Sequence, residues 1–448
     1  MKRDLNHTAT SSIQLTPDEQ SMLDGDSGEA MSKVMKTLVR YGELFGARRL
    51  VPLDGPTHVV TSMGMAGLEA AFDLLDTLIA AGARTVEPFT VDPRPYDFDA
   101  VPYTDAEMRD IRALYPHQDR YEAQLRALGL KDEDAFSCTA YLPETGNTPG
   151  EGDILSWAES SAVVFANSVL GARTNRNSGL IELMGAIAGR APEFGLLLDS
   201  GRLATWQIDV RTTVLPPATV LGSEIGRRVV EGVPYITGLD RFLTDLPPAA
   251  ARDYLKDFGA ATASSGAVGL FHIDKVTPEA IRLGTTLLAG GFASAVIDDD
   301  TIVPTAGSER VSEPRRNTEP ETALIGCPHL SREQLSMVVD SIVGSLEDNG
   351  KSHVSIRTIL STAPHAVRAF RSEHPGKYER AIAAGITIST FCPALHMNCP
   401  SSAGAPVITN STKLRTYTTS RFFRDDVVLH RIVHGNGQAM ESANGATS

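Results

Sequence analysis

Three cysteines that are far apart in the sequence each lie in a short motif of small, polar and proline residues. Cys138 lies in Ser-Cys-Thr-Ala-Tyr, Cys327 in Gly-Cys-Pro-His and Cys392 in Phe-Cys-Pro. The chain has only four cysteines in 448 residues, so most of them belong to such motifs. Thiolates bind soft metals, and a proline directly after a ligand cysteine recurs in iron–sulfur loops. The pattern favours a metal or iron–sulfur site that forms when the chain folds.

The residues alone leave three interpretations of these cysteines open. A free cysteine is most often a small buried apolar side chain. A structural zinc site would need a fourth ligand, and Cys399 and His329 are the options. An iron–sulfur cluster is the third interpretation, although the chain has no close Cys-x-x-Cys pair. Spacing does not decide among buried thiols, zinc and a cluster.

Composition and charge exclude several classes of protein. The 55 acidic residues outnumber the 41 basic ones, which gives a net charge of −14 and disfavours binding to nucleic acid. No apolar run is long enough to cross a bilayer, and no apolar stretch follows the first basic residues as in a secretory signal. Few cysteines without an export signal indicate the reducing cytoplasm. We expect a disordered tail over 1–14 and a frayed one over 434–448.

Strand and helix signals alternate along most of the chain. Strands are expected at 49–53, 58–60, 85–91, 195–198, 268–273, 322–325 and 386–389, with helices between many of them. This alternation predicts an α/β fold with largely parallel sheets. Cys327 and Cys392 would then follow the carboxyl ends of strands, where α/β proteins collect ligands. The polar, proline-containing stretch 298–322 is predicted to be an internal boundary or a long surface loop.

Two polar segments could bind a small acid. The segment 157–179 packs Asn, Ser, Thr and Arg around apolar residues, so we expect it to pass through the interior. Its buried polar groups must be paired, and a carboxylate ligand would pair them. In the second segment, 406–413, an apolar strand runs into a polar turn that ends at Lys413, a candidate anion-binding residue.

These segments together resemble the aconitase X family, in its catalytic or large-subunit part, from about residue 15 to 433. The resemblance is carried by ordered motifs that include the cysteine loops. They are Gly28-Glu29-Ala30-Met31, Tyr41-Gly42-Glu43, the Cys138 loop, Trp157-Ala158-Glu159-Ser160, the run from Ala166 to Asn175, Gly326-Cys327-Pro328-His329 and Thr409-Asn410-Ser411-Thr412-Lys413.

The resemblance implies a fold, a cofactor and a set of site residues. The fold would be aconitase-like, with several packed three-layer α/β/α subdomains around a central cluster and a substrate cleft. An iron–sulfur cluster would be held by Cys138, Cys327 and Cys392. Three protein ligands would leave one iron open as a Lewis acid for the substrate hydroxyl. The implied substrate-binding residues are Thr61, Ser62, Met63, Asp92, Pro93, Asn167, Ser168 and Lys413.

Departures from the family pattern favour one substrate. Family members act on a hydroxyproline or on phosphorylated mevalonate. The phosphomevalonate branch resembles Gly-Val-Ser and Asn-Pro where this chain has Thr61-Ser62-Met63 and Asp92-Pro93. An aspartate beside a phosphate is repulsive, whereas the ammonium of an amino acid tolerates it. We therefore expect dehydration of cis-3-hydroxy-L-proline to 1-pyrroline-2-carboxylate.

Two alternatives and a partner accompany this expectation. The first alternative is the large subunit of a mevalonate 5-phosphate dehydratase, and the second is a non-catalytic metal-binding subunit with a structural zinc. Fused family members carry an additional C-terminal swivelling domain, and this chain stops soon after the Lys413 motif. We expect a separate small subunit to supply that domain and the general base, since no convincing base stands out here.

Overall fold

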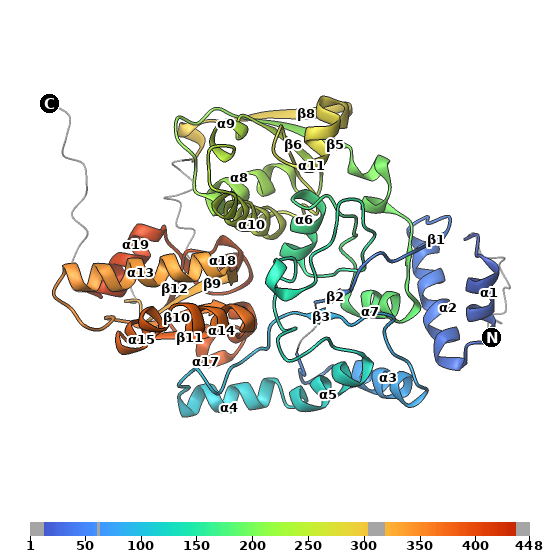
Figure 1. Ribbon diagram of the computed structural model, residues 1–448, viewed down its shortest axis with the longest axis horizontal. Coiled ribbons are helices and arrows are strands. Elements are labelled where there is room, and N and C mark those ends of the chain that lie inside the picture. The colour runs from blue at the N-terminus through green and yellow to red at the C-terminus, as the bar shows by residue number, and fades with distance from the viewer. Residues whose placement is uncertain (1–12, 61–62, 303–318, 436–448) are drawn as a thin grey trace, which may run out of the picture.

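The chain folds into three consecutive groups of helices and strands, which Figure 1 colours from blue to red along the sequence. The computed structural model describes residues 13–60, 63–302 and 319–435. The large sheets are parallel and are covered by helices, so the predicted α/β fold is confirmed. Most of the stretch predicted as a boundary or loop, 298–322, lies outside the described residues, as do both predicted tails except 13–14 and 434–435. The described helices include none that is both long and apolar enough to cross a membrane.

The first group is mainly helical and has only short strands. Its two sheets are two-stranded, with β1 antiparallel to β4 and β2 parallel to β3. The elements are α1 Pro17–Asp24, α2 Glu29–Leu44, β1 Leu50–Pro52, β2 His58–Val59, α3 Glu69–Ala80, β3 Thr90–Val91, α4 Asp105–Leu114, α5 Gln118–Leu128, α6 Ser160–Ser168, α7 Gly179–Ala188 and β4 Arg190–Pro192, with short 3-10 helices at Pro143–Thr145, Gly195–Leu197 and Asp199–Arg202.

Two strands predicted for this group differ from the structure. The strand expected at 85–91 is reduced to β3, and the one expected at 195–198 is a 3-10 helix. Asn175 explains the second difference, because its side chain accepts a hydrogen bond from the Leu196 N–H and donates one to the Phe194 carbonyl. A side chain thus satisfies the backbone groups that a neighbouring strand would otherwise pair.

The second group is a four-stranded parallel sheet in the order β7-β6-β5-β8, with helices packed against it. Buried aliphatic residues of α8 and α10 form its core together with β5 and β6. Its elements are β5 Ala204–Val210, α8 Ala218–Val229, β6 Pro234–Thr237, α9 Asp240–Leu243, α10 Pro248–Ser265, β7 His272–Ile273, α11 Pro278–Leu283, a 3-10 helix Gly284–Leu287 and β8 Leu288–Ile297.

The third group is a five-stranded parallel sheet in the order β11-β10-β9-β12-β13. The chain moves outward from β9 in one direction and then starts again at β12 on the other side, so the order reverses between β9 and β12. Its elements are β9 Thr322–Leu330, α13 Arg332–Asp348, β10 Arg357–Thr362, α14 Pro364–Glu373, α15 Pro375–Ala383, β11 Ile386–Ser389, α16 Pro393–His396, α17 Pro400–Gly404, β12 Val407–Thr409, α18 Thr412–Tyr417, β13 Arg421–Phe422 and α19 Asp425–His434.

Alternation along the strands divides this third group into two layers of core. Ala323 and Ile325 of β9 pack with α13, α14, α15 and α19 on one face. Leu324, between them, packs on the other face with Met397 and Leu414, near α16 and α18. This period-two pattern is that of a sheet buried on both faces, so the third group has the predicted three layers.

A bulge in β9 presents one of the cysteines. Gly326 to His329 bulge out opposite the single residue Ser361 of β10, between the pairs Ile325–Leu360 and Leu330–Thr362. Gly326 has φ +108°, and a Cβ there would lie 2.1 Å from the Ser361 carbonyl oxygen, so only glycine fits. The expectation that the strand ends before Cys327 is therefore wrong, because β9 continues to Leu330 and the bulge turns Cys327 out of the ladder.

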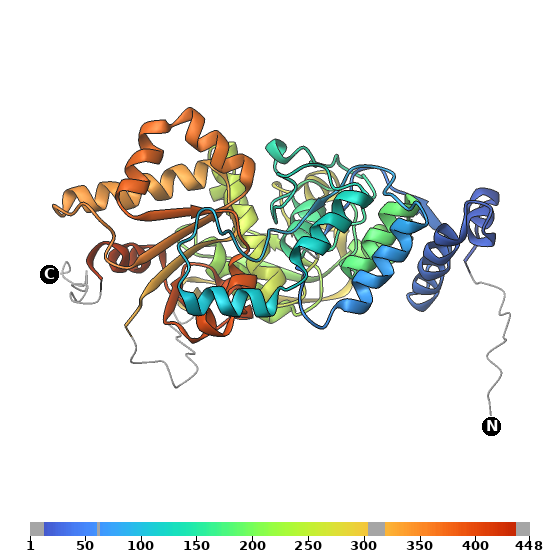
Figure 2. The same cartoon turned by 90° about the horizontal axis from the view of Figure 1, so that it is seen from below.

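The three groups meet around α6 and α10. Helix α6 is buried along nearly its whole length, and α10 packs against α6, α8 and α18. Figures 1 and 2 both show the segment leading into α4 crossing from the first group to the third. Cysteines from the first and third groups can therefore lie at one centre.

Candidate functional site

His329 connects the loops that carry the three predicted cysteine ligands. Its backbone N–H donates to the Cys138 Sγ at 3.3 Å, and it follows Cys327 by two residues. Its imidazole Nε2 lies 3.1 Å from the carbonyl oxygen of Phe391, the residue before Cys392. The structure thus brings the loops of all three cysteines into contact at the carboxyl ends of β9 and β11.

All three thiols are free and largely removed from water. Burial raises the pKa of each, well above the usual value for Cys138 and to about 12 for Cys392. The negative charge of a Cys327 thiolate contributes to the rise in the pKa of Cys392. Unligated, the thiols keep their protons, whereas cationic iron would stabilise the thiolates and release those protons.

The donor set is compatible with an iron–sulfur cluster. Three thiols without a carboxylate or imidazole among them are a soft ligand set. Within the described parts of the chain, no three His, Cys, Asp or Glu side chains gather tightly enough to hold a metal ion.

The two residues considered as a fourth ligand have other contacts, although the buried Nδ1 of His329 has no hydrogen-bond partner among the described residues. The ring of His329 is fully buried, and burial lowers its pKa to about 3, so the imidazole is neutral. Its Nε2 faces the Phe391 carbonyl. Cys399 lies in an apolar cluster with Ile111 and Tyr115.

Lys413 forms a buried ion pair beside the thiols. Its Nζ lies 2.5 Å from Glu159 Oε1 and donates to the Ser161 Oγ, also at 2.5 Å. Lys413 is 10% exposed and Glu159 5%. The other oxygen of Glu159 accepts the Ala162 N–H at the start of α6, where a carboxylate is favoured by the helix dipole. The pair therefore joins the N-terminal ends of α6 and α18.

The charges of this pair hold each other ionised. Burial alone raises the pKa of Glu159, but Lys413 outweighs it and lowers the value to about 2. Burial likewise lowers the pKa of Lys413, but Glu159 and then the thiolates of Cys327 and Cys138 raise it above the usual range. Ser411, two residues before Lys413, donates to the Cys327 carbonyl, so the turn that carries Lys413 contacts one of the cysteine loops.

Asp92 is the second carboxylate at the site, and His58 supports it. His58 Nε2 lies 3.3 Å from Asp92 Oδ1, and its Nδ1 lies 2.9 Å from the hydroxyl of Thr90. That hydroxyl accepts a hydrogen bond from Asn147, so it is free to donate to Nδ1, and the ring proton then sits on Nε2 and faces Asp92. Burial raises the pKa of Asp92 to about 6, and the negative charge of Glu159 contributes to the rise. The hydrogen bond from His58 lowers the pKa but does not outweigh burial.

Comparison with known proteins decides the family. A family model described as the first domain of aconitase X matches residues 12–200, and another described as its second domain matches residues 205–302. The phosphomevalonate dehydratase large subunit of Methanothermobacter thermautotrophicus is 34% identical over 330 residues, 73% of this chain and 76% of that protein. The chain belongs to the aconitase X family.

Two further likenesses extend along most of this aconitase X chain. The cis-3-hydroxy-L-proline dehydratase of Pseudomonas aeruginosa is 30% identical over 417 residues, 89% of this chain and 65% of that protein. The crystal structure of the holo-form of Thermococcus kodakaraensis aconitase X superposes with a TM-score of 0.75 at 28% identity, covering 95% of this chain and all of that one. The aconitase-like fold is therefore confirmed, and the enzymatic class is that of a dehydratase.

The other residues predicted to bind substrate fall in different places. Thr61 and Ser62 lie outside the described residues, whereas Met63 packs beside the apolar cluster of Cys399. Pro93 is buried directly after Asp92. The segment around Asp92 therefore lies next to the site. The contribution of Thr61 and Ser62 to substrate binding stays a prediction.

Asn167 and Ser168 do not face the thiols but join the first and second groups. The amide of Asn167 donates to the carbonyls of Thr174 and Gly269, and its oxygen accepts from the Thr174 N–H and from Arg202. Ser168 accepts the Phe271 N–H. Both side chains are almost fully buried. Their hydrogen-bond partners are protein groups, whereas a ligand was expected from the sequence. Their predicted contact with substrate has no support in this geometry.

Sequence reasoning missed Glu159, Ser161 and His58 as site residues. Glu159 was visible as part of a family motif, and it stands three residues before a buried N–H of α6, a typical capping position. Its partner Lys413 is 254 residues away in the sequence, so the spacing of residues could not predict the ion pair. His58 belongs to a strand whose neighbour, β3, supplies Thr90, and Asp92 follows β3 directly.

A buried carboxyl outside the site predicts how stability depends on pH. Burial raises the pKa of Glu182 on α7 to about 8, although the Ser156 hydroxyl donates to it. The folded chain keeps this proton while the unfolded chain releases it near its ordinary value, so stability should fall as pH rises from about 4.5 to about 8. We expect Glu182→Gln to raise the urea midpoint relative to wild type more at pH 8 than at pH 5. An equal change at both pH values would contradict this prediction.

Proposed function

We propose that this chain is the large subunit of a dehydratase that converts cis-3-hydroxy-L-proline to 1-pyrroline-2-carboxylate. The observation that carries the choice of substrate is Asp92, a largely buried carboxylate that lies 3.3 Å from His58 Nε2. A buried anion needs a cation as its partner. The secondary ammonium of hydroxyproline is such a cation, and Lys413 is a counter-charge for its carboxylate.

The three thiols support an iron–sulfur cofactor on Cys138, Cys327 and Cys392. When bound there, the cluster would supply Lewis-acid assistance to departure of the C3 hydroxyl as hydroxide. The chain's own residues bind and orient the amino acid. Asp92 accepts from the ammonium, and Lys413 with Ser161 donates to the carboxylate, so the ring is fixed with its C2–H and C3–OH next to the thiol loops. Loss of the C2 proton and the hydroxyl then gives an enamine that tautomerises to the imine.

A small partner subunit is part of this proposal. The relative from M. thermautotrophicus is named a large subunit, and the chain spans 65% of the P. aeruginosa dehydratase. A second chain would supply the part that covers the site and the base that removes the C2 proton. We place the complex in the cytoplasm, where free cysteines stay reduced.

The second candidate substrate is mevalonate 5-phosphate, which the name of one relative supports. The 34% identical relative is named a phosphomevalonate dehydratase. Asp92 and Glu159 oppose this candidate, since a phosphate near two carboxylates is repelled. The two candidates therefore differ in their dependence on the charge of Asp92.

Replacing Asp92 with asparagine should separate the two substrates. Asn keeps the shape and accepts from His58 but removes the charge, so we expect kcat/KM for cis-3-hydroxy-L-proline to fall about 10- to 100-fold, the range of a lost charged hydrogen bond. Turnover of mevalonate 5-phosphate should not fall. The measurement is the ratio of the two kcat/KM values in the complex with its small subunit, with Asp99→Asn at an exposed position of the same loop as the control. An equal fall for both substrates would contradict the proposed role.

A further inference from the structure

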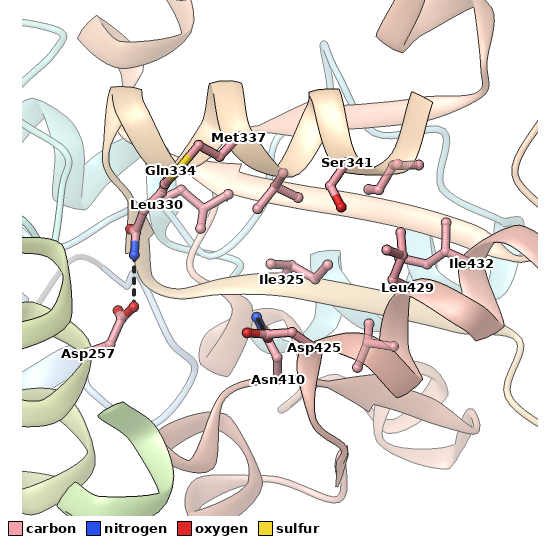
Figure 3. A pocket seen from close by; sticks show the side chains of 13 residues that line it. Asp257, Ile325, Leu330, Gln334, Met337, Ser341, Asn410, Asp425, Leu429 and Ile432 are labelled. Atoms are coloured by element: carbon pink, nitrogen blue, oxygen red, sulfur yellow. Dashed lines mark hydrogen bonds between the residues drawn. The ribbon is translucent and has the colours of Figure 1, made fainter. Parts of the chain in front are cut away.

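A groove separate from the catalytic residues opens on the third sheet between α13 and α19 (Figure 3). It lies where the strand order reverses between β9 and β12, a position at which α/β sheets commonly bind ligands. Its volume is about 350 Å³, within the range of small-molecule sites. The apolar lining residues are Ile325, Leu330, Met337, Val338, Ile342, Val428, Leu429 and Ile432.

The groove is a wedge that suits a small molecule and not a helix. Ile342 of α13 and Ile432 of α19 belong to the same buried cluster, so the two helices close together at the apolar end. One turn of a helix 10 Å across occupies roughly 400 Å³, more than the whole groove. An occupant must therefore be a compact group with a short apolar body.

Two carboxylates determine the charge that the groove accepts. Asp257 of α10 lies at one end and Asp425 of α19 further along, while Leu429 and Ile432 lie at the other end (Figure 3). Gln334 Nε2 donates to Asp257 at 2.8 Å, and Asn410 Nδ2 donates to Asp425 at 2.8 Å. Asp425 is thus oriented by a neutral amide, whereas Asp257 also pairs through its other oxygen with the buried Lys256, at 2.6 Å. The thirteen lining residues include two aspartates and no Lys, Arg or His.

The groove and the catalytic site use opposite sides of one turn. Asn410 lines the groove, whereas Ser411 donates to the Cys327 carbonyl and Lys413 pairs with Glu159. An ammonium in the groove would face Asp257 and Asp425, and it would not meet the substrate-binding residues. The groove is therefore a second site with its own ligand chemistry.

We propose that this groove binds a small amphiphilic organic cation, with an alkyl body between α13 and α19 and an ammonium head at Asp257 and Asp425. The apolar walls favour the body because each buried methylene adds to affinity. The carboxylates favour the head through charge and through hydrogen bonds from the ammonium. A carboxylate ligand of the same length meets the same walls but is repelled at the acidic end.

Calorimetric titration of the full chain at low ionic strength tests this proposal. The probes are butyl-, pentyl- and hexylammonium, with hexanoate as the ligand of opposite charge. We expect hexylammonium to bind with a Kd on the order of 1 mM, with two- to fourfold tighter binding for each added methylene. Hexanoate should bind at least tenfold more weakly. Equal affinity for the two hexyl ligands, or no saturable binding of hexylammonium in the millimolar range, would overturn the proposal.

Substitutions locate the binding. Asp257→Asn and Asp425→Asn should each weaken hexylammonium binding about three- to fivefold, as expected for a partly exposed charge pair, and the double variant should weaken it further. The control is Asp426→Asn, the next residue on α19, which pairs with Arg424 and does not line the groove. If Asp425→Asn weakens binding no more than Asp426→Asn does, the ammonium lies elsewhere and the proposal is wrong.

Discussion

Replacing Cys327 with serine is expected to remove the proposed iron–sulfur cluster and with it the dehydratase activity. Serine keeps the size of the side chain, but its hydroxyl is a hard, weakly acidic donor that replaces a thiolate poorly. We expect iron and sulfide per chain to fall to background, visible absorption to disappear and turnover to drop below detection. Cys138→Ser and Cys392→Ser should behave alike, because His329 joins all three loops.

Cys399→Ala supplies the matched control for these three variants. Cys399 is equally buried but lies in the apolar cluster with Ile111 and Tyr115, so its loss should leave iron content and turnover near those of the wild type. Circular dichroism distinguishes cluster loss from unfolding, since each variant should keep its helices. Normal iron content and activity in Cys327→Ser would contradict the assignment of the ligands.

Replacing Lys413 with methionine is expected to cause a large loss of stability as well as of activity. Methionine fills the space of the lysine stem but leaves the Glu159 carboxylate buried without its cation. Breaking a buried pair on one side costs about 3–5 kcal/mol, a large part of the 5–15 kcal/mol that stabilises a typical domain. The free energy of unfolding from urea titration at pH 7 measures this loss.

A double-mutant cycle separates the pair from its surroundings. Glu159→Gln in the Lys413→Met background removes the orphaned charge, so the double variant should be more stable than Lys413→Met alone. Lys33→Met on α2 is the control, because its ion pair with Glu29 is exposed, and it should leave the urea midpoint unchanged within error. The buried pair would be refuted as a structural element if Lys413→Met were as mild as Lys33→Met.

The sequence predicted the parts of the site that local pattern determines. The strand before Cys392 runs from 386 to 389 as expected, and a helix follows Ser331 with its capping box. The bulge at Cys327 escaped prediction because it depends on Ser361, in a strand that pairs with β9 only after folding. Whether a polar residue meets a ligand or a protein group is also a property of the folded chain. In the folded chain Asn167 pairs with backbone carbonyls, and Glu159 pairs with Lys413.

The central claim concerns the molecule on which the thiol-lined site acts. The complex of this chain with the proposed small subunit, reconstituted anaerobically, can be incubated in turn with cis-3-hydroxy-L-proline and with mevalonate 5-phosphate, while proton NMR follows the products. The account predicts conversion of hydroxyproline to 1-pyrroline-2-carboxylate, at a kcat/KM well above that for the phosphate ester. Dehydration of mevalonate 5-phosphate without turnover of hydroxyproline would contradict it.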